Sequence, residues 1–135
     1  MHGEDLHVLV VDDSAMVRQV MQAILSTNSR VKVNVAADPL IAWVKMQKEP
    51  PDVVITDLEM PRMTGYELMV QLRQSPTTRR IPVMVVTSRA GAKHRDRAMK
   101  EGATAFLTKP VQEDQLIAAV EQLMGSETRP TVPVG

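Results

Sequence analysis

The chain of 135 residues is long enough for one domain with one core, and 44% of its residues are apolar. Lysine and arginine together number 16, as do aspartate and glutamate, so the zero formal charge gives no general case for binding nucleic acid or an anionic membrane. The lack of cysteine excludes disulfides and thiolate metal sites. Apolar runs too short for a membrane span, and an N-terminus without the layout of a signal peptide, lead us to expect a cytoplasmic protein.

Short apolar runs rich in β-branched residues predict five strands: Leu6–Val11, Val31–Ala36, Asp52–Thr56, Ile81–Val86 and Thr104–Thr108. Helical spacing between them predicts five helices: one through Leu25 behind the N-cap Ser14, Pro39–Lys48 behind Asp38, Gly65–Gln74 behind Thr64, Ala92–Lys100 before the stop Gly102, and Gln112–Met124. Strands that alternate with helices predict an α/β fold, with a doubly wound parallel sheet covered on both faces. We assign residues 1–125 to this domain, and 126–135, which contain two prolines and no apolar periodicity, to a flexible tail or linker stub.

The residues that carry chemistry follow the predicted strands. Open parallel sheets bind ligands beyond the carboxyl ends of their strands. The first strand delivers Asp12 and Asp13, the third Asp57, the fourth Thr87 and Ser88, and the fifth Lys109. We therefore expect these side chains to meet at one edge of the sheet.

Three carboxylates at one edge need a cation between them, and hard oxygen donors suit Mg²⁺. A site with Mg²⁺, a lysine and a threonine, but neither histidine nor cysteine, favours phosphoryl chemistry over zinc-dependent hydrolysis. Asp57 is the candidate nucleophile, because it stands alone on the middle strand and a carboxylate can form an acyl phosphate. Each residue alone has an ordinary explanation, such as Asp13 and Ser14 capping a helix; the combination indicates a site.

The motifs resemble those of the receiver domain of bacterial two-component response regulators. The similarity spans about residues 6–124 and is carried by VVDDS (10–14), DLEMPRMTG (57–65), VVTS (85–88), EGA (101–103) and FLTKP (106–110). It implies a flavodoxin-like, five-stranded sheet of order 2-1-3-4-5 with five helices. Within the family, the chain looks most like receivers of chemotaxis-type hybrid histidine kinases, and VDDSAMVRQVM is also similar to the receiver of the chemotaxis methylesterase.

This resemblance implies a phosphorylation-activated signalling domain rather than an enzyme with its own substrate. Mg²⁺ would be held by Asp12 or Asp13, by Asp57 and by the backbone carbonyl of Glu59. Asp57 would accept a phosphoryl group from a phosphohistidine of a sensor histidine kinase or a histidine phosphotransfer domain, and Lys109 would pair with that group.

The resemblance also implies a switch. Thr87 would move toward the phosphoryl group, the Ser88 backbone would contact it, and Phe106 would turn inward to fill the space left. Glu59 and Arg89 occupy positions that resemble the family's sites for tuning phosphoryl lifetime.

The family's output surface corresponds to the predicted elements 92–100, 104–108 and 112–124, which would bind a downstream protein. The chain would be a monomer or a phosphorylation-dependent dimer, and the Lys109–Pro110 bond resembles the family's cis peptide. The helix 39–48 is apolar almost all round, which indicates either a partner surface or ordinary exposure of Leu40, Ile41 and Val44. His94 is interpreted as a surface residue rather than a ligand.

Two other functions fit parts of the pattern. Haloacid-dehalogenase-like phosphohydrolases also use an aspartyl nucleophile, Mg²⁺, threonine and lysine, and Glu59 stands where they carry an acid. That group places its further acids after the lysine, however, whereas Asp12 and Asp13 precede Asp57 here. The third possibility is a pseudo-receiver that is never phosphorylated and only binds partners.

Overall fold

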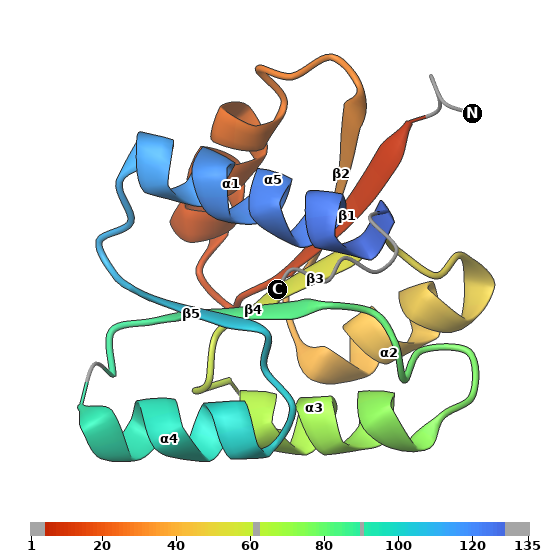
Figure 1. Cartoon of the computed structure of the whole chain (residues 1–135), viewed down its shortest axis with the longest axis vertical. Helices are drawn as coiled ribbons and strands as arrows, with labels where there is room; N and C mark the ends of the chain where they lie inside the picture. Colours follow the sequence, from red (N-terminus) through yellow and green to blue (C-terminus); the bar gives the residue numbers. More distant parts are fainter. Residues whose placement is uncertain (1–4, 61–62, 90, 129–135) are drawn as a thin grey trace.

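The computed structural model describes residues 5–60, 63–89 and 91–128. Its strands are β1 (Leu6–Val11), β2 (Val31–Ala36), β3 (Val53–Thr56), β4 (Val83–Thr87) and β5 (Ala105–Thr108). They form one parallel sheet in the order β2-β1-β3-β4-β5 (Figure 1), which confirms the predicted topology. The direction of winding reverses between β1 and β3, so a ligand site is expected beyond the carboxyl ends of these two strands.

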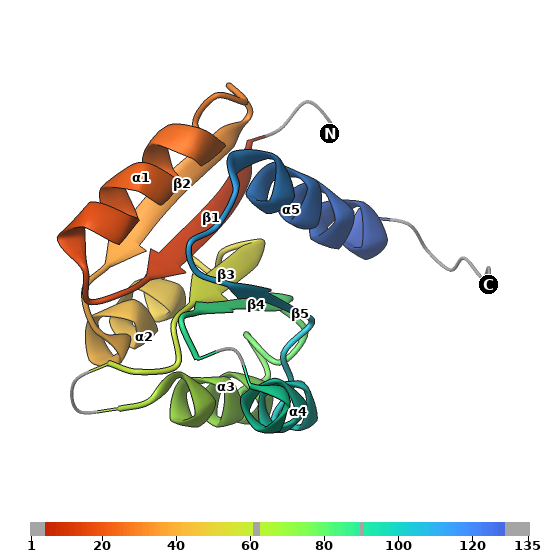
Figure 2. The ribbon, with the colours of Figure 1, turned by 90° about the vertical axis from the view of Figure 1, so that its left-hand side faces the viewer.

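The helices cover both faces of the sheet: α1 (Ala15–Leu25), α2 (Pro39–Lys48), α3 (Gly65–Gln74), α4 (Ala92–Lys100) and α5 (Glu113–Thr128). Helices α1 and α5 lie on one face, and α2, α3 and α4 lie on the other (Figure 2). In β4, Val83 and Val85 join the core beneath α2–α4, whereas Met84 and Val86 join the core beneath α1 and α5. This two-sided burial explains why the central strands are continuous apolar runs in the sequence.

The predicted helix caps are confirmed. The side-chain oxygens of Ser14, Asp38 and Thr64 each accept a hydrogen bond from a backbone N–H in the first turn of their helix. Thr64 also forms a reciprocal capping box with Glu67. Gly102 adopts a φ of +116° just after α4, as expected for a glycine that ends a helix.

Some boundaries differ from the predictions. β4 begins at Val83 rather than Ile81, because Pro82 has no amide to donate; the Pro82 carbonyl still accepts the Val54 N–H at 3.0 Å. β3 and β5 each begin one residue later than predicted. Val20 lies at helical spacing with the apolar residues Val17 and Ile24 of α1, yet it is 50% exposed.

The last helix is longer than predicted. α5 continues to Thr128 instead of ending at Met124. Residues 125–128 contain no proline, and Pro130 disfavours helix only from the residue before it. The domain boundary at 125 and the tail over 126–135 therefore stay predictions, and residues 129–135 lie outside the described part of the chain.

The helix α2 is apolar on several sides, as predicted. Ala42 and Met46 are fully buried, whereas Leu40, Ile41 and Val44 are exposed. Across the described ranges of the chain, no helix combines the length and the apolar character needed to cross a membrane.

Candidate functional site: a carboxylate and lysine cluster at the strand ends

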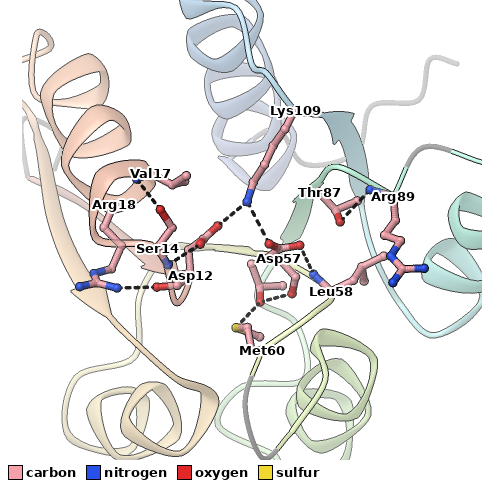
Figure 3. A network of polar contacts seen from close by, with 11 residues as sticks. Asp12, Ser14, Val17, Arg18, Asp57, Leu58, Met60, Thr87, Arg89 and Lys109 are labelled. Carbon is pink, nitrogen blue, oxygen red and sulfur yellow. Dashed lines mark hydrogen bonds and ion pairs between the residues drawn. The ribbon is translucent and has the colours of Figure 1, made fainter.

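Four strand ends bring the predicted chemical residues to one edge of the sheet. Asp12 follows β1, Asp57 follows β3, Thr87 ends β4, and Lys109 follows β5. Figure 3 shows these side chains converging. Backbone hydrogen bonds hold the strand ends in register, since the Asp57 N–H donates to Val11 at 3.2 Å and the Lys109 N–H donates to Thr87 at 2.8 Å.

Lys109 links two of the carboxylates. Its Nζ lies 2.9 Å from Asp12 Oδ2 and 2.9 Å from Asp57 Oδ2. Burial alone would lower the pKa of Lys109, but its hydrogen bonds to Asp57 and Asp12, together with the charges of both carboxylates, outweigh that effect and raise the pKa above its ordinary value. Lys109 therefore stays protonated and acts as a fixed positive charge in the site.

The Asp57 carboxylate is held on both oxygens. Oδ1 accepts the Leu58 N–H at 2.6 Å, and Oδ2 accepts from Lys109. The start of α3 packs against the same backbone: the Gly65 N–H donates to the Leu58 carbonyl at 2.9 Å, and a Cβ on Gly65 would lie 2.2 Å from the Asp57 carbonyl oxygen. The sequence pattern identifies Gly65 as a helix start and as part of a motif, but it does not predict this steric role.

The three aspartates fit a divalent cation. Asp12, Asp13 and Asp57 each offer a carboxylate oxygen, and these oxygens lie within 4.8 Å of one another. Lys109 neutralises one of the three negative charges, so two remain for a cation to balance. Mg²⁺ prefers oxygen ligands and is held in proteins by one or two carboxylates with waters completing its shell, and this donor set can supply those ligands.

The predicted switch and tuning residues surround this cluster. Thr87 is buried, and its Oγ1 accepts the Arg89 N–H at 3.2 Å. The Arg89 guanidinium forms an exposed ion pair with the Glu59 carboxylate. Ser88 is exposed, and Phe106 is half-buried against the core beneath α2–α4. The Lys109–Pro110 bond is cis, as the resemblance implies.

Two arginines with structural contacts were missed by the sequence analysis. Arg18 donates to the Asp12 carbonyl at 2.7 Å, beside the carboxylate cluster. Arg73 lies at the opposite edge of the sheet, and the pKa of its guanidinium is lowered by burial. It donates to three carbonyls that precede β4 and β5, at 2.9, 2.7 and 2.6 Å: Arg79, Ile81 and Gly102. Every residue has a backbone carbonyl, so no pattern of residue types could have predicted either set of contacts.

A doubly wound sheet with clustered carboxylates and a lysine beyond its carboxyl edge is typical of phosphoryl-binding α/β domains. Comparison with known proteins identifies the family. Residues 8–121 match the model of the response regulator receiver domain, and the chain belongs to that family. It is a receiver domain of phosphorylation-activated two-component signalling, and neither alternative considered from the sequence gains support.

The curated relatives are longer than this chain. Response regulator Rre1 of Synechocystis is 35% identical over 125 residues, which are 93% of this chain and 54% of the relative. A protein-glutamate methylesterase/protein-glutamine glutaminase of Pseudomonas syringae is 42% identical over 113 residues, which are 82% of this chain and 31% of the relative. The chain thus matches the receiver portion and spans about half or less of these proteins.

Solved structures agree with this assignment. The chemotaxis protein CheY4 of Vibrio cholerae is 31% identical with a TM-score of 0.82, and the match covers 88% of this chain and 98% of that one. The receiver domain of the sensor histidine kinase PA1611 of Pseudomonas aeruginosa, solved with a magnesium ion in its active-site cleft, has a TM-score of 0.82. It is 23% identical over 90% of this chain and 98% of its own, and supports the fold alone.

Proposed function

We propose that Asp57 is the phosphoacceptor and that its donor is a phosphohistidine of a sensor kinase or a histidine phosphotransfer domain. One observation carries the proposal. Asp57 Oδ2 lies 2.9 Å from Lys109 Nζ, and a carboxylate oxygen of Asp57 lies within 4.8 Å of one oxygen each of Asp12 and Asp13. In the reaction an Asp57 oxygen bonds to phosphorus while the P–N bond breaks, and the bonding electron pair stays on the imidazole nitrogen. Lys109 would pair with the phosphoryl oxygens as they arrive.

In this proposal Asp12, Asp13, Asp57 and the Glu59 carbonyl hold Mg²⁺. The bound ion supplies positive charge that offsets the carboxylates and the phosphoryl oxygens. Asp12 is buried and Asp13 is exposed, so the cluster has one side in the protein and one open to solvent and to a partner.

Labelling with acetyl phosphate and Mg²⁺ tests the acceptor. We expect intact mass spectrometry to show one labile phosphoryl group on the wild type and none on Asp57→Asn. Asp52→Asn is the matched control, because Asp52 precedes the same strand at the opposite edge and its Oδ2 accepts the His7 N–H, a bond that the amide oxygen can keep. Repeated turnover of phosphate esters would instead indicate a phosphohydrolase, and no labelling would indicate a pseudo-receiver.

The proposal includes the switch. Phosphorylation would draw Thr87 toward the phosphoryl group, which the Ser88 backbone would contact, and Phe106 would turn inward. Phe106 already packs against the core under α4, so its movement would alter the α4–β5–α5 surface that binds a downstream protein. Amide hydrogen exchange with and without acetyl phosphate tests this, and unchanged exchange over α4 and β5 in a fully labelled sample would contradict it. A cytoplasmic location and a monomer or phosphorylation-dependent dimer stay part of the proposal, and Glu59 with Arg89 would tune phosphoryl lifetime.

The phosphodonor is proposed to dock in an apolar groove beside the site. The groove has a volume of about 420 Å³ and joins α1 to the start of α5: Met16, Val17, Val20, Met21, Ile24, Ser88, Lys109, Pro110, Val111 and Leu116. It contains Lys109 and Ser88, so an apolar helix seated there would lie next to the acceptor.

Charge introduced into the groove tests this docking. Met16 is 73% exposed, and we expect Met16→Glu to slow transfer from any histidine kinase that labels the wild type, with acetyl phosphate labelling unchanged. Leu40→Glu, on the exposed side of α2, is the control and should transfer normally. Equal rates of transfer to the wild type, Met16→Glu and Leu40→Glu would refute docking of the phosphodonor in this groove.

A further inference from the structure

Each polar group of Asp12, in its backbone and its side chain, makes a hydrogen bond. Its N–H donates to the Ala36 carbonyl at 3.1 Å, its Oδ1 accepts the Ser14 N–H at 2.9 Å, and its Oδ2 accepts from Lys109 at 2.9 Å. Its carbonyl oxygen accepts from an Arg18 Nη at 2.7 Å. The carboxylate belongs to the proposed phosphoryl site, but nothing in that chemistry uses the carbonyl or Arg18.

The Arg18 contact is specific in its geometry. Arg18 is the fourth residue of α1, and its half-buried side chain reaches back past the helix start to the Asp12 carbonyl (Figure 3). Ser14 caps the same helix through Val17 N–H at 3.2 Å. The turn between β1 and α1 is thus tied at both ends, to the strand through Asp12 and to the helix through Ser14 and Arg18.

The Asp12 carbonyl belongs to the peptide unit that leads into Asp13. The Asp13 side chain is exposed, and among the described residues no hydrogen bond or ion pair holds its carboxylate. Its oxygen nevertheless lies within 4.8 Å of those of Asp12 and Asp57. The backbone sets the direction of the Asp13 Cα–Cβ bond, and Arg18 holds the peptide unit that leads into it.

We infer that Arg18 is a positioning residue for the cation site: by holding the Asp12–Asp13 peptide, it aims the Asp13 carboxylate at the shared cluster. This inference rests on the proposed magnesium site. Arg18 binds a carbonyl rather than a carboxylate, so it leaves the Asp13 oxygens free for a metal. Groups that orient metal ligands in this way are commonly worth about 10- to 100-fold in metal affinity.

A purely electrostatic role and a positioning role of Arg18 predict opposite changes in the affinity for Mg²⁺ when the charge of Arg18 is removed. Removing a cation near three carboxylates strengthens the attraction for Mg²⁺ and would tighten binding. Loss of the fixed peptide plane would leave Asp13 free to turn away and would weaken binding. The sign of the change therefore separates a positioning role from a purely electrostatic one.

Isothermal titration calorimetry with MgCl₂ on the full chain measures this sign. For Arg18→Met and Arg18→Gln we expect a Kd about tenfold higher than for the wild type. Arg18→Lys keeps one donor on a long stem and should fall between these variants and the wild type. The matched control is Arg73→Met, which removes an arginine that also binds carbonyls but lies at the opposite edge of the sheet; it should lose stability and keep the wild-type Kd.

The outcomes distinguish the inference from the proposal beneath it. A wild type that binds no Mg²⁺ would refute the metal site itself. A wild type that binds, with an Arg18→Met or Arg18→Gln protein that binds equally or more tightly, would refute the positioning role alone. Circular dichroism shows which neutral variant folds, and either folded variant suffices for the comparison.

Discussion

The Lys109 ammonium lies 2.9 Å from the Asp57 carboxylate although β4 separates the strands that carry the two residues. The same nitrogen lies 2.9 Å from Asp12, which follows β1, one strand further away. A single side chain from the edge strand β5 therefore joins the carboxyl ends of the central strands. Without a metal it supplies the positive charge that keeps these two carboxylates together.

Replacing Lys109 by methionine tests this link. The variant keeps an apolar stem but leaves two largely buried carboxylates facing each other. Breaking a buried ion pair costs about 3–5 kcal/mol, and we expect about 2 kcal/mol here because water reaches the Lys109 side chain, which is 21% exposed. Urea unfolding in EDTA measures the loss. Lys93→Met on the exposed side of α4 is the control, and a Lys109→Met protein as stable as this control would contradict the structure.

The raised pKa of Lys109 predicts a pH dependence at the alkaline end. The folded protein holds this proton more tightly than the unfolded chain, whose pKa is near the ordinary value of 10.5. The stabilisation is therefore complete below that pH and is lost as the pH rises through the folded pKa. The difference in unfolding free energy between the wild type and Lys109→Met isolates this group, since the other lysines titrate in both proteins. It should be constant from about pH 7 to about pH 9.5 and shrink as the pH rises past the ordinary pKa of 10.5; a difference that grows with pH would exclude this explanation.

We expect Asp13 to contribute to Mg²⁺ binding but not to the stability of the metal-free protein. Its exposed carboxylate adds to the repulsion in the cluster, so we expect Asp13→Asn to be as stable as the wild type in EDTA, or slightly more stable. A ligand at 100 times its Kd stabilises a folded protein by about 2.7 kcal/mol. Urea unfolding at a saturating Mg²⁺ concentration should show that gain for the wild type and much less for Asp13→Asn. Equal gains in both proteins would remove Asp13 from the metal site.

The strand-end residues of the site could be predicted because a parallel sheet gathers the carboxyl ends of distant segments. Asp12 and Lys109 lie 97 positions apart in the chain, yet each directly follows an apolar run. The caps were equally clear, since Ser14 and Thr64 act on backbone groups a few residues away. Such short-range signals fixed where the helices begin and therefore where the loops of the site lie.

The remaining features depend on tertiary geometry. The contacts of Arg18 and Arg73 end on backbone carbonyls, which every residue offers, so no residue type identifies the acceptor. Val20 fits the apolar stripe of α1, but the groove beside α5 leaves half of it exposed. Position 65 needs a glycine because the start of α3 lies against the backbone that follows β3. This close approach is a tertiary contact, so the sequence alone does not predict it.

Gly65→Ala tests whether the start of α3 sets the geometry of the acceptor. A Cβ at this position would lie 2.2 Å from the Asp57 carbonyl oxygen and 3.0 Å from the Leu58 Cα, and neither backbone atom can rotate away. We expect a loss of about 2–3 kcal/mol in urea unfolding, as for other overpacked sites. Labelling by acetyl phosphate should also slow. The substitution would shift the backbone of Asp57 and Leu58, and with it the Asp57 carboxylate and the Leu58 N–H that binds it.

Gly91→Ala is the matched control for this substitution. The nearest atom to a Cβ at Gly91 is a His94 side-chain carbon at 3.9 Å, and the backbone there suits an L residue, with a φ of −60°. We expect a change in unfolding free energy within about 1 kcal/mol and a normal rate of labelling. If Gly65→Ala matched this control in both measurements, α3 could not be packed against the acceptor as the structure has it. If it lost stability but kept the labelling rate, the contact would support the fold without shaping the site.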